Sequence, residues 1–365
     1  MSVLSSTSSS NQRLPKSRWI SVLGAGFVLL ILFASLLEMR LAIRGFKPSI
    51  SDSANLWIQE RERVDGLGTR ALVLVGSSRP LLDMDLDTLR RETGLEPVQL
   101  AIDGSSFVPV LKGLADDPDV KGTVLVDFAE NVLTVPAQSD AANAYEAEFE
   151  KTRLRHVPDF EDSEAHLSKL LYEHMRSYAD GTRPLTALVR RVLNRTPTPQ
   201  YLRMLPDREV QADYSQVTQP VFYYARVVRN LGQTVPLEGR SYRDIETDFG
   251  RRIAALQPFD NSLFLRSLPA IEDMTRTIQR HGGRVIFVTF PTSGYIRLID
   301  DKRFPRDRFW DRFGDIVNAP HLNFEDVPDL RRFYCPDGSH LDFHDRTAFT
   351  LALIKALDLK DAGTP

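Results

Sequence analysis

Short, continuous runs of apolar and β-branched residues constrain this chain more than any other feature. Four such runs occupy residues 71–75, 98–102, 122–127 and 284–290, and a weaker fifth lies at 322–324. Strands that are apolar at every position, rather than at alternate ones, are covered on both faces, as in a parallel sheet. The sequence therefore predicts a parallel sheet of five strands.

Helical patterns lie between these runs. Residues 82–91 and 261–280 carry apolar side chains at helical spacing and end at glycines, and a last helix is expected at about 346–357. Parallel strands need crossover connections, which are usually helices. The alternation predicts an α/β fold, with a three-layer α/β/α sandwich as its architecture.

Residues from about 138 to 260 interrupt this alternation. They are rich in Arg, Tyr and Glu, with helical stretches expected near 141–155, 163–178 and 185–193. We interpret them as a helical insertion between the third and fourth strands, inside a domain that runs from 68 to 365.

An uncharged apolar segment spans residues 19–37. As a helix it would rise roughly 28 Å, close to the hydrocarbon thickness of a bilayer. Arg13, Lys16 and Arg18 precede it, and Trp19 suits the membrane interface. A cleaved signal peptide is the alternative, but the apolar run is longer than such peptides usually have and no small-x-small cleavage site follows it.

These patterns predict a Ser-rich cytoplasmic tail at 1–18, a transmembrane anchor at 19–39 and a linker at 40–67. A short basic tail ahead of a single anchor usually stays in the cytoplasm. The expected location is therefore a cell inner membrane, with the main domain periplasmic or extracellular.

Composition argues against several functional classes. The net charge of -3, from 46 Lys and Arg against 49 Asp and Glu, does not suit a dedicated nucleic-acid-binding protein. The single cysteine, Cys335, excludes an intramolecular disulfide and a four-cysteine zinc site. The chain has no phosphate-binding loop, dinucleotide-binding glycine pattern or metal-ligand spacing, so no cofactor or metal is expected.

Polar turn residues follow three of the predicted strands. Gly76, Ser77 and Ser78 follow the first, Gly104 follows the second and Asn131 follows the third. The carboxyl ends of parallel strands form the crevice in which active sites lie. A serine there can act as a nucleophile, and glycine or asparagine N–H groups can stabilise an oxyanion. Taken singly, each of these residues also fits an ordinary turn or helix cap.

A second polar cluster precedes the last predicted helix. Asp337 and His340 are three residues apart across a glycine turn, so one loop can supply an imidazole base and the carboxylate that orients it. His344 is a rival base, and we favour His340 because Asp337 shares its turn. A capping Asp beside a surface His is the alternative for this segment.

Together and in this order, the motifs resemble the blocks of the SGNH/GDSL hydrolase superfamily. The Gly-Ser-Ser block implies Ser78 as the nucleophile, and the second block implies Gly104 as an oxyanion donor. The Asp-Gly-x-His block implies Asp337 and His340 as the rest of a catalytic triad. The resemblance also implies a flavodoxin-like α/β/α fold.

The third block of the family, Gly-x-Asn-Asp, is not reproduced, since residues 128–131 read Phe-Ala-Glu-Asn. Asn131 is the position that would supply a further oxyanion donor. The resemblance covers roughly 68–137 and 282–358. Neither the insertion nor the anchor is part of it.

Within the superfamily, the Gly-Ser-Ser form and the anchor are similar to membrane-bound proteins that modify cell-envelope polymers, such as the D-alanine-transfer and alginate-acetylation proteins. That similarity implies O-acyl transfer or ester hydrolysis on an envelope polysaccharide or related polymer through an acyl-serine. It also implies a membrane-bound O-acyltransferase partner that supplies the acyl group. The alternative is a non-catalytic accessory or glycan-binding subunit of an envelope biosynthesis complex. An unrelated α/β fold whose motifs are only turns and caps is a third possibility.

Overall fold

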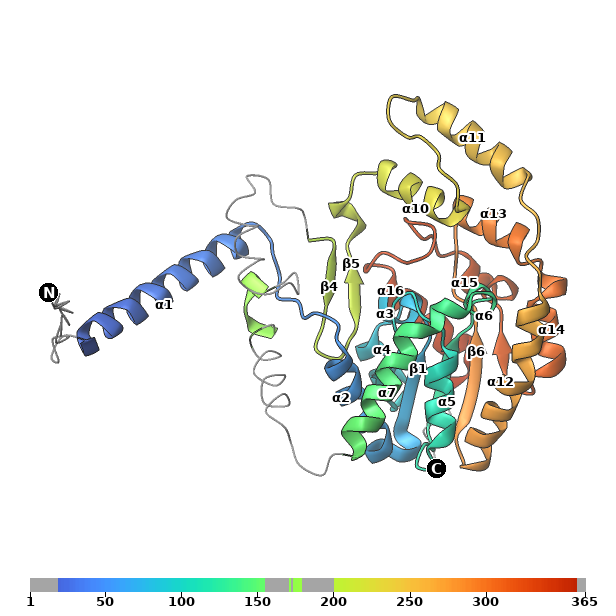
Figure 1. Cartoon of the computed structure of the whole chain (residues 1–365), viewed down its shortest axis with the longest axis horizontal. Coiled ribbons are helices and arrows are strands. Elements are labelled where there is room, and N and C mark those ends of the chain that lie inside the picture. Colours follow the sequence, from blue (N-terminus) through green and yellow to red (C-terminus); the bar gives the residue numbers. More distant parts are fainter. Residues whose placement is uncertain (1–18, 155–170, 172, 179–199, 360–365) are drawn as a thin grey trace, which may run out of the picture.

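The computed structural model describes residues 19–154, 171, 173–178 and 200–359 of the 365-residue chain (Figure 1). Its centre is a parallel sheet of five strands in the order β2-β1-β3-β6-β7. The strands are β1 (Ala71–Val75), β2 (Glu96–Gln99), β3 (Thr123–Asp127), β6 (Arg284–Val288) and β7 (His321–Leu322). The predicted α/β class and five-stranded parallel sheet are confirmed.

The second strand differs from its predicted bounds of 98–102. β2 ends at Gln99, but the backbone N–H groups of Leu100 and Ile102 still donate to the carbonyls of Leu74 and Gly76, at 2.8 and 3.0 Å. The apolar run therefore continues beside β1 after the regular strand has ended.

Both faces of the sheet are covered, because successive strand side chains point to opposite sides. Val73 and Val75 of β1 belong to one hydrophobic cluster, and Leu72 and Leu74 belong to another. The first cluster includes side chains of α2 (Ala54–Leu67), α5 (Val108–Asp116), α7 (Asp140–Leu154), α12 (Ser262–Arg280) and α14 (Trp310–Ile316). The second includes side chains of α4 (Leu86–Thr93), α15 (Pro328–Arg331) and α16 (Arg346–Leu357).

The segment between β3 and β6 is not wholly helical, which corrects the expected helical insertion. It contains α7, α10 (Val221–Leu231) and α11 (Tyr242–Ala254), but also an antiparallel hairpin of β4 (Leu202–Met204) and β5 (Val210–Ala212). The helices expected near 163–178 and 185–193 fall largely outside the described residues.

The insertion reaches the carboxyl end of the sheet. α10 and α11 pack with α13 (Gly294–Arg303), the helix that follows β6, in a separate hydrophobic cluster (Figure 1). Part of the insertion therefore lies over the edge where the predicted motifs gather.

The remaining short elements are α3 (Ser78–Asp83), α6 (Asn131–Thr134) and the 3-10 turns η1 (Gly68–Arg70), η2 (Pro136–Ser139), η3 (Arg176–Tyr178), η4 (Tyr214–Gln216), η5 (Arg306–Arg308) and η6 (Phe324–Asp326).

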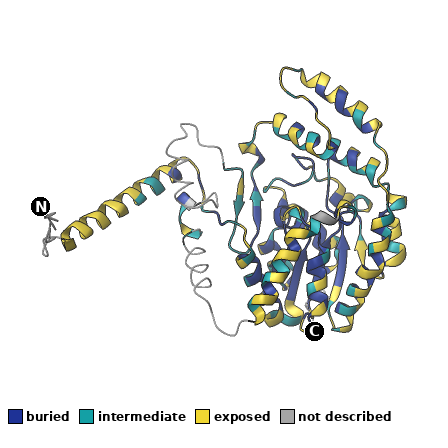
Figure 2. Ribbon diagram, viewed as in Figure 1, coloured by how far each residue is buried: buried dark blue, intermediate teal, exposed yellow. Residues whose placement is uncertain are grey.

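The N-terminal helix, α1 (Trp19–Ile43), is long and apolar enough to span a membrane. Its side chains are almost all exposed, and Leu41 near its end is the buried one (Figure 2). The helix runs four residues past the predicted end of the anchor at 39. The tail expected at 1–18 lies outside the part of the chain that the structure describes.

Candidate active site

Ser78 lies at the carboxyl end of the sheet, shortly after β1. The strand ends at Val75, and Ser78 is the first residue of α3. Gly76 makes the turn with a φ of +154°, and a Cβ added to it would lie 2.6 Å from the Cβ of Asp127. Because real Cβ atoms do not approach so closely, only glycine lets the chain turn here against the end of β3.

Ser78 and His340 are 262 positions apart in sequence and touch in the structure. The Oγ of Ser78 lies 2.6 Å from Nε2 of His340, and Nδ1 of His340 lies 2.9 Å from Oδ2 of Asp337. This is the arrangement of a nucleophile, a general base and an orienting carboxylate. The structure thus brings together the three residues that the sequence singles out.

Asp337 is fully buried, yet it is built to stay ionised. Its Oδ1 accepts hydrogen bonds from the backbone N–H groups of Ser339 and His340, at 2.9 and 2.8 Å. Burial alone would raise the pKa of Asp337, but the hydrogen bond from His340, with the charges of His340 and Arg226, holds that pKa well below its usual range. The carboxylate can therefore stabilise an imidazolium at His340.

The loop that carries the base is held from two sides. Gly338 has a φ of +88°, and a Cβ there would lie 2.3 Å from Cγ1 of Ile296, so the turn requires glycine. On the other side, the backbone N–H of Leu341 donates to Oδ1 of Asp83 at 2.9 Å. Since Asp83 is the last residue of α3, the short helix that begins with Ser78 also anchors the histidine loop.

The rival base, His344, is not part of this arrangement. Its Nδ1 lies 2.5 Å from Oδ1 of Asp342, and the side chain is exposed. The hydroxyl of Ser78 pairs with His340 instead.

Arg226, which lies on α10 of the insertion, is a site residue that the sequence did not predict. Its Nη2 lies 3.2 Å from Oδ2 of Asp337 and 3.3 Å from Nδ1 of His340. An arginine on an amphipathic helix more than 100 positions away carries no local signal of such a role. Only the packing of the insertion over the sheet reveals it.

A small pocket of about 120 Å³ opens beside Ser78. Asn131, one of the two predicted oxyanion donors, lines this pocket. Gly104 lies in an exposed turn after β2, with a φ of +67°, and is not among the residues that line the pocket. The structure therefore places one of the two predicted oxyanion donors beside the nucleophile.

Carboxyl groups surround Arg79 at the same pocket. Its Nη1 lies 3.6 Å from Oδ1 of Asp127, and Glu130 and Asp300 also line the pocket. Burial raises the pKa of Glu130 to about 7 and that of Asp300 to about 6. The charge of this pocket therefore changes in the neutral pH range.

Within the described part of the chain, no three His, Cys, Asp or Glu side chains are grouped closely enough to hold a metal ion. Cys335 is buried against Pro291, and burial raises the pKa of its thiol well above the ordinary value.

Comparisons with protein-family models and with curated proteins find no match to this chain.

Proposed function

We propose that this chain is a membrane-anchored serine O-acyltransferase or esterase of the SGNH/GDSL type, acting on a cell-envelope polysaccharide or related polymer. The hydrogen-bonded series Ser78–His340–Asp337 at the carboxyl end of a parallel sheet carries the proposal. The strand order and the hydrophobic clusters on both faces support a flavodoxin-like three-layer sandwich as its scaffold.

The proposed reaction has two acyl transfers. The Oγ of Ser78 attacks the ester carbonyl while Nε2 of His340 takes the hydroxyl proton, and Asp337 stabilises the imidazolium through Nδ1. Collapse of the tetrahedral intermediate expels the donor alcohol, which receives that proton, and leaves an acyl-serine. A polymer hydroxyl or a water then gives its proton to His340, attacks the acyl-serine and regenerates the free hydroxyl of Ser78.

Oxyanion stabilisation is assigned to the backbone N–H of Ser78 and the side-chain amide of Asn131. The first N–H groups of a helix have no acceptor within the helix, and Ser78 begins α3. Asn131 lines the pocket beside it. Gly104 stays a prediction from the family resemblance.

The proposed setting is the outer side of a cell inner membrane, with α1 as a single-pass anchor and the N-terminus in the cytoplasm. A membrane-bound O-acyltransferase is the proposed acyl donor. Anchoring both proteins in one membrane would raise the effective concentration of donor at Ser78, which favours transfer over free hydrolysis.

The test uses the full-length protein in detergent with a fluorophosphonate probe and a chromogenic acetate ester. We expect Ser78→Ala to lose labelling and to lower ester turnover by at least about a thousandfold, since removal of a triad member leaves little activity. Ser77→Ala is the matched control, because the Ser77 side chain makes no capping hydrogen bond to α3. Equal labelling of Ser78→Ala and the wild type would refute the assignment, whereas labelling confined to Ser78 would exclude the non-catalytic alternative.

A further inference from the structure

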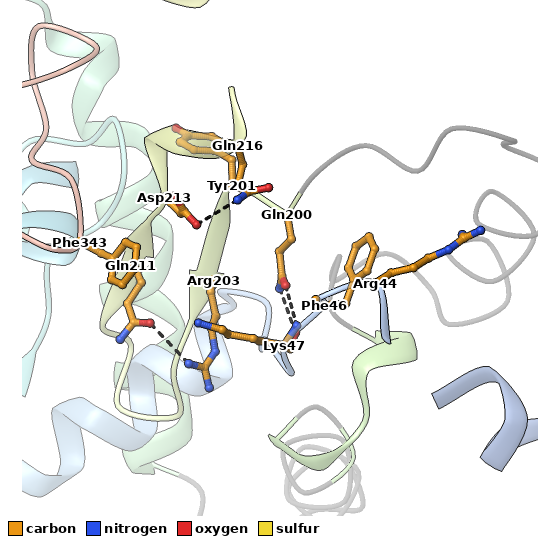
Figure 3. A pocket seen from close by; sticks show the side chains of 11 residues that line it. Arg44, Phe46, Lys47, Gln200, Tyr201, Arg203, Gln211, Asp213, Gln216 and Phe343 are labelled. Atoms are coloured by element: carbon orange, nitrogen blue, oxygen red, sulfur yellow. Dashed lines mark hydrogen bonds between the residues drawn. The ribbon is translucent and has the colours of Figure 1, made fainter. Parts of the chain in front are cut away.

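A second and larger pocket lies where α1 ends and the main domain begins (Figure 3). It has a volume of about 450 Å³ and is formed by residues 44–47, the two strands of the β4–β5 hairpin with their flanking residues, and Phe343. The proposed acyl-transfer chemistry uses none of these residues. The pocket therefore needs an explanation of its own.

Cations outnumber carboxylates in this pocket. Arg44, Lys47 and Arg203 line it, against the single carboxylate of Asp213. The ion pairs within 4.0 Å that the described residues form include none of the three cations. Asp213 is occupied elsewhere, because it accepts hydrogen bonds from the backbone N–H of Ser215 at 3.1 Å and from Nε2 of Gln216 at 3.3 Å.

Arg203 is held in position by hydrogen bonds, and no carboxylate of the described residues lies within 4.0 Å of its guanidinium. Its Nε donates to the carbonyl of Pro48 at 2.9 Å, and its Nη1 donates weakly to Oε1 of Gln211 at 3.4 Å. Partial burial lowers the pKa of Arg203, and the charge of Glu209, which acts in the opposite direction, does not offset this effect. An arginine fixed in this way still has N–H donors for a ligand.

Lys47 is fixed by its backbone. Its N–H donates to Oε1 of Gln200 at 2.8 Å, and its carbonyl accepts from Nε2 of the same side chain at 2.9 Å. The Nζ lies 5.9 Å from the ring centre of Phe343. Figure 3 shows the side chains of Lys47 and Arg203 extending toward the side of the pocket that carries Gln211 and Phe343, while Arg44 extends the other way.

Two like charges on one side of a pocket repel each other unless an anion lies between them. A phosphate group suits this arrangement, because its oxygens accept several hydrogen bonds from Lys and Arg at once. The position points to the same chemistry: residues 44–47 follow directly after the helix that is long and apolar enough to span a membrane. With α1 inserted, this pocket lies at the level of the lipid headgroups.

We propose that this pocket binds a phosphate group, and that the phosphodiester of an anionic lipid headgroup is the occupant that its position favours. The lipid source rests on α1 being a membrane anchor, which is part of the proposed function. Binding does not depend on Ser78, so the two proposals can fail separately.

Occupation of the pocket would affect the domain through the hairpin. The ring of Tyr201, which lines the pocket, lies 5.6 Å from the ring of Tyr214. The backbone N–H of Tyr214 donates at 2.9 Å to Oδ2 of Asp342. Asp342 comes two residues after His340, the proposed base. A bound headgroup would therefore hold the hairpin against the linker and fix how the active site faces the membrane.

The first experiment places full-length protein in phosphatidylcholine nanodiscs that contain a photoactivatable phosphatidylglycerol, and maps the cross-links by mass spectrometry. We expect cross-links at 44–47 and 200–216, and about fivefold less labelling in Arg203→Gln, the effect of one interfacial cation. Arg203→Lys keeps the charge and should retain most of the labelling. Arg312→Gln, which removes an exposed cation on α14, is the matched control and should label as the wild type does.

The second experiment titrates the protein in pure phosphatidylcholine nanodiscs with inorganic phosphate and glycerol 1-phosphate. Saturable binding that is lost in Arg203→Gln, without lipid labelling at the pocket, would establish a phosphate site with a soluble occupant. The proposal is overturned if lipid labelling of Arg203→Gln equals that of Arg312→Gln and neither inorganic phosphate nor glycerol 1-phosphate binds. Ser78→Ala should behave as the wild type in both experiments, and a melting curve of Arg203→Gln in the same nanodiscs shows whether the variant folds.

Discussion

A negatively charged and a positively charged side chain both lie close to one ring nitrogen of His340. Nδ1 lies 2.9 Å from Oδ2 of Asp337 and 3.3 Å from Nη2 of Arg226, which itself lies 3.2 Å from that Oδ2. Nδ1 must carry its proton to donate to the carboxylate, so the guanidinium cannot also donate to it. The useful contact of Arg226 is therefore the ion pair with Asp337, which locks the carboxylate in place for the histidine.

Replacing Arg226 tests this positioning role. We expect Arg226→Gln to lower the rate of fluorophosphonate labelling of Ser78 about tenfold, because a looser Asp337 orients His340 less well. Arg226→Lys keeps a charge near Asp337 and should recover part of the rate. If both variants label at the wild-type rate, the ion pair has no role in orienting the base.

Glu130 provides a pH-dependent test of the pocket. Because burial raises the pKa of Glu130 from 4.5 to about 7, the folded state keeps a proton that the unfolded state loses over that pH range. The contribution of Glu130 to the free energy of unfolding therefore falls as pH rises from about 4.5 to 7.

Glu130→Gln removes this titration. We expect the free energy of unfolding of the variant to exceed that of the wild type by about 1–2 kcal/mol at pH 8 and by much less at pH 5, as measured by chemical denaturation. Asp315→Asn, at an exposed carboxylate of α14, should show no such pH-dependent difference. A gain that is the same at both pH values would contradict the raised pKa.

At the scale of elements, the site depends on how closely β1 and β3 approach where they end. Gly76 permits that approach, since a Cβ there would meet the Cβ of Asp127 at 2.6 Å. The same turn places Ser78 at the start of α3, whose last residue anchors the histidine loop. One short strand–turn–helix unit therefore sets the position of both the nucleophile and the base.

Gly76→Ala should disturb that unit. We expect a loss of about 2–4 kcal/mol in the free energy of unfolding, from steric overlap at an unfavourable φ, and loss of fluorophosphonate labelling. Gly250→Ala in α11 is the matched control, because its Cβ would meet nothing within 4 Å. That variant should be neutral or up to about 1 kcal/mol more stable, since alanine suits a helix interior better.

At the scale of the whole molecule, the linker after α1 is fastened to the domain through the insertion. Arg208 is fully buried, and its guanidinium binds both carboxylate oxygens of Asp52 at 2.9 Å and the carbonyls of Gln99 and Ala101 at 2.6 and 3.0 Å. The hairpin thus joins the linker to the edge of the sheet. α1 itself adds little to the core, with Leu41 as its buried residue.

Removal of residues 1–43 should therefore leave a folded domain. We expect the truncated chain to stay soluble without detergent and to keep Ser78 labelling. Its Tm should fall by less than about 8 °C, because the described contacts that are lost are chiefly those of Leu41 and Glu38 and the backbone hydrogen bonds at the end of α1. Circular dichroism melting and size-exclusion chromatography check this outcome, and an unfolded or aggregated product would show that α1 is part of the fold.

How much the sequence could predict depends on how local each signal is. The strands at 71–75 and 122–127 are predictable from the sequence, because burial on both faces makes most of their residues apolar. The helix expected at 82–91 is instead divided into α3 and α4, because Met84 and Asp85 leave the helical conformation between them. No local pattern predicts the β4–β5 hairpin, because its strands are only three residues long and are stabilised by distant partners.

The sequence by itself determined the parallel sheet, the apolar helix at the N-terminus and the candidates Ser78, Asp337 and His340, since each of these leaves a local pattern of residue types. The tertiary structure alone decided that Arg226 meets Asp337, that Asn131 rather than Gly104 lines the pocket beside Ser78, and that a basic pocket forms beside the end of α1. These juxtapositions depend on how the insertion packs over the sheet and against the linker. Contacts between residues more than 100 positions apart arise from packing of the whole chain, which no local pattern records.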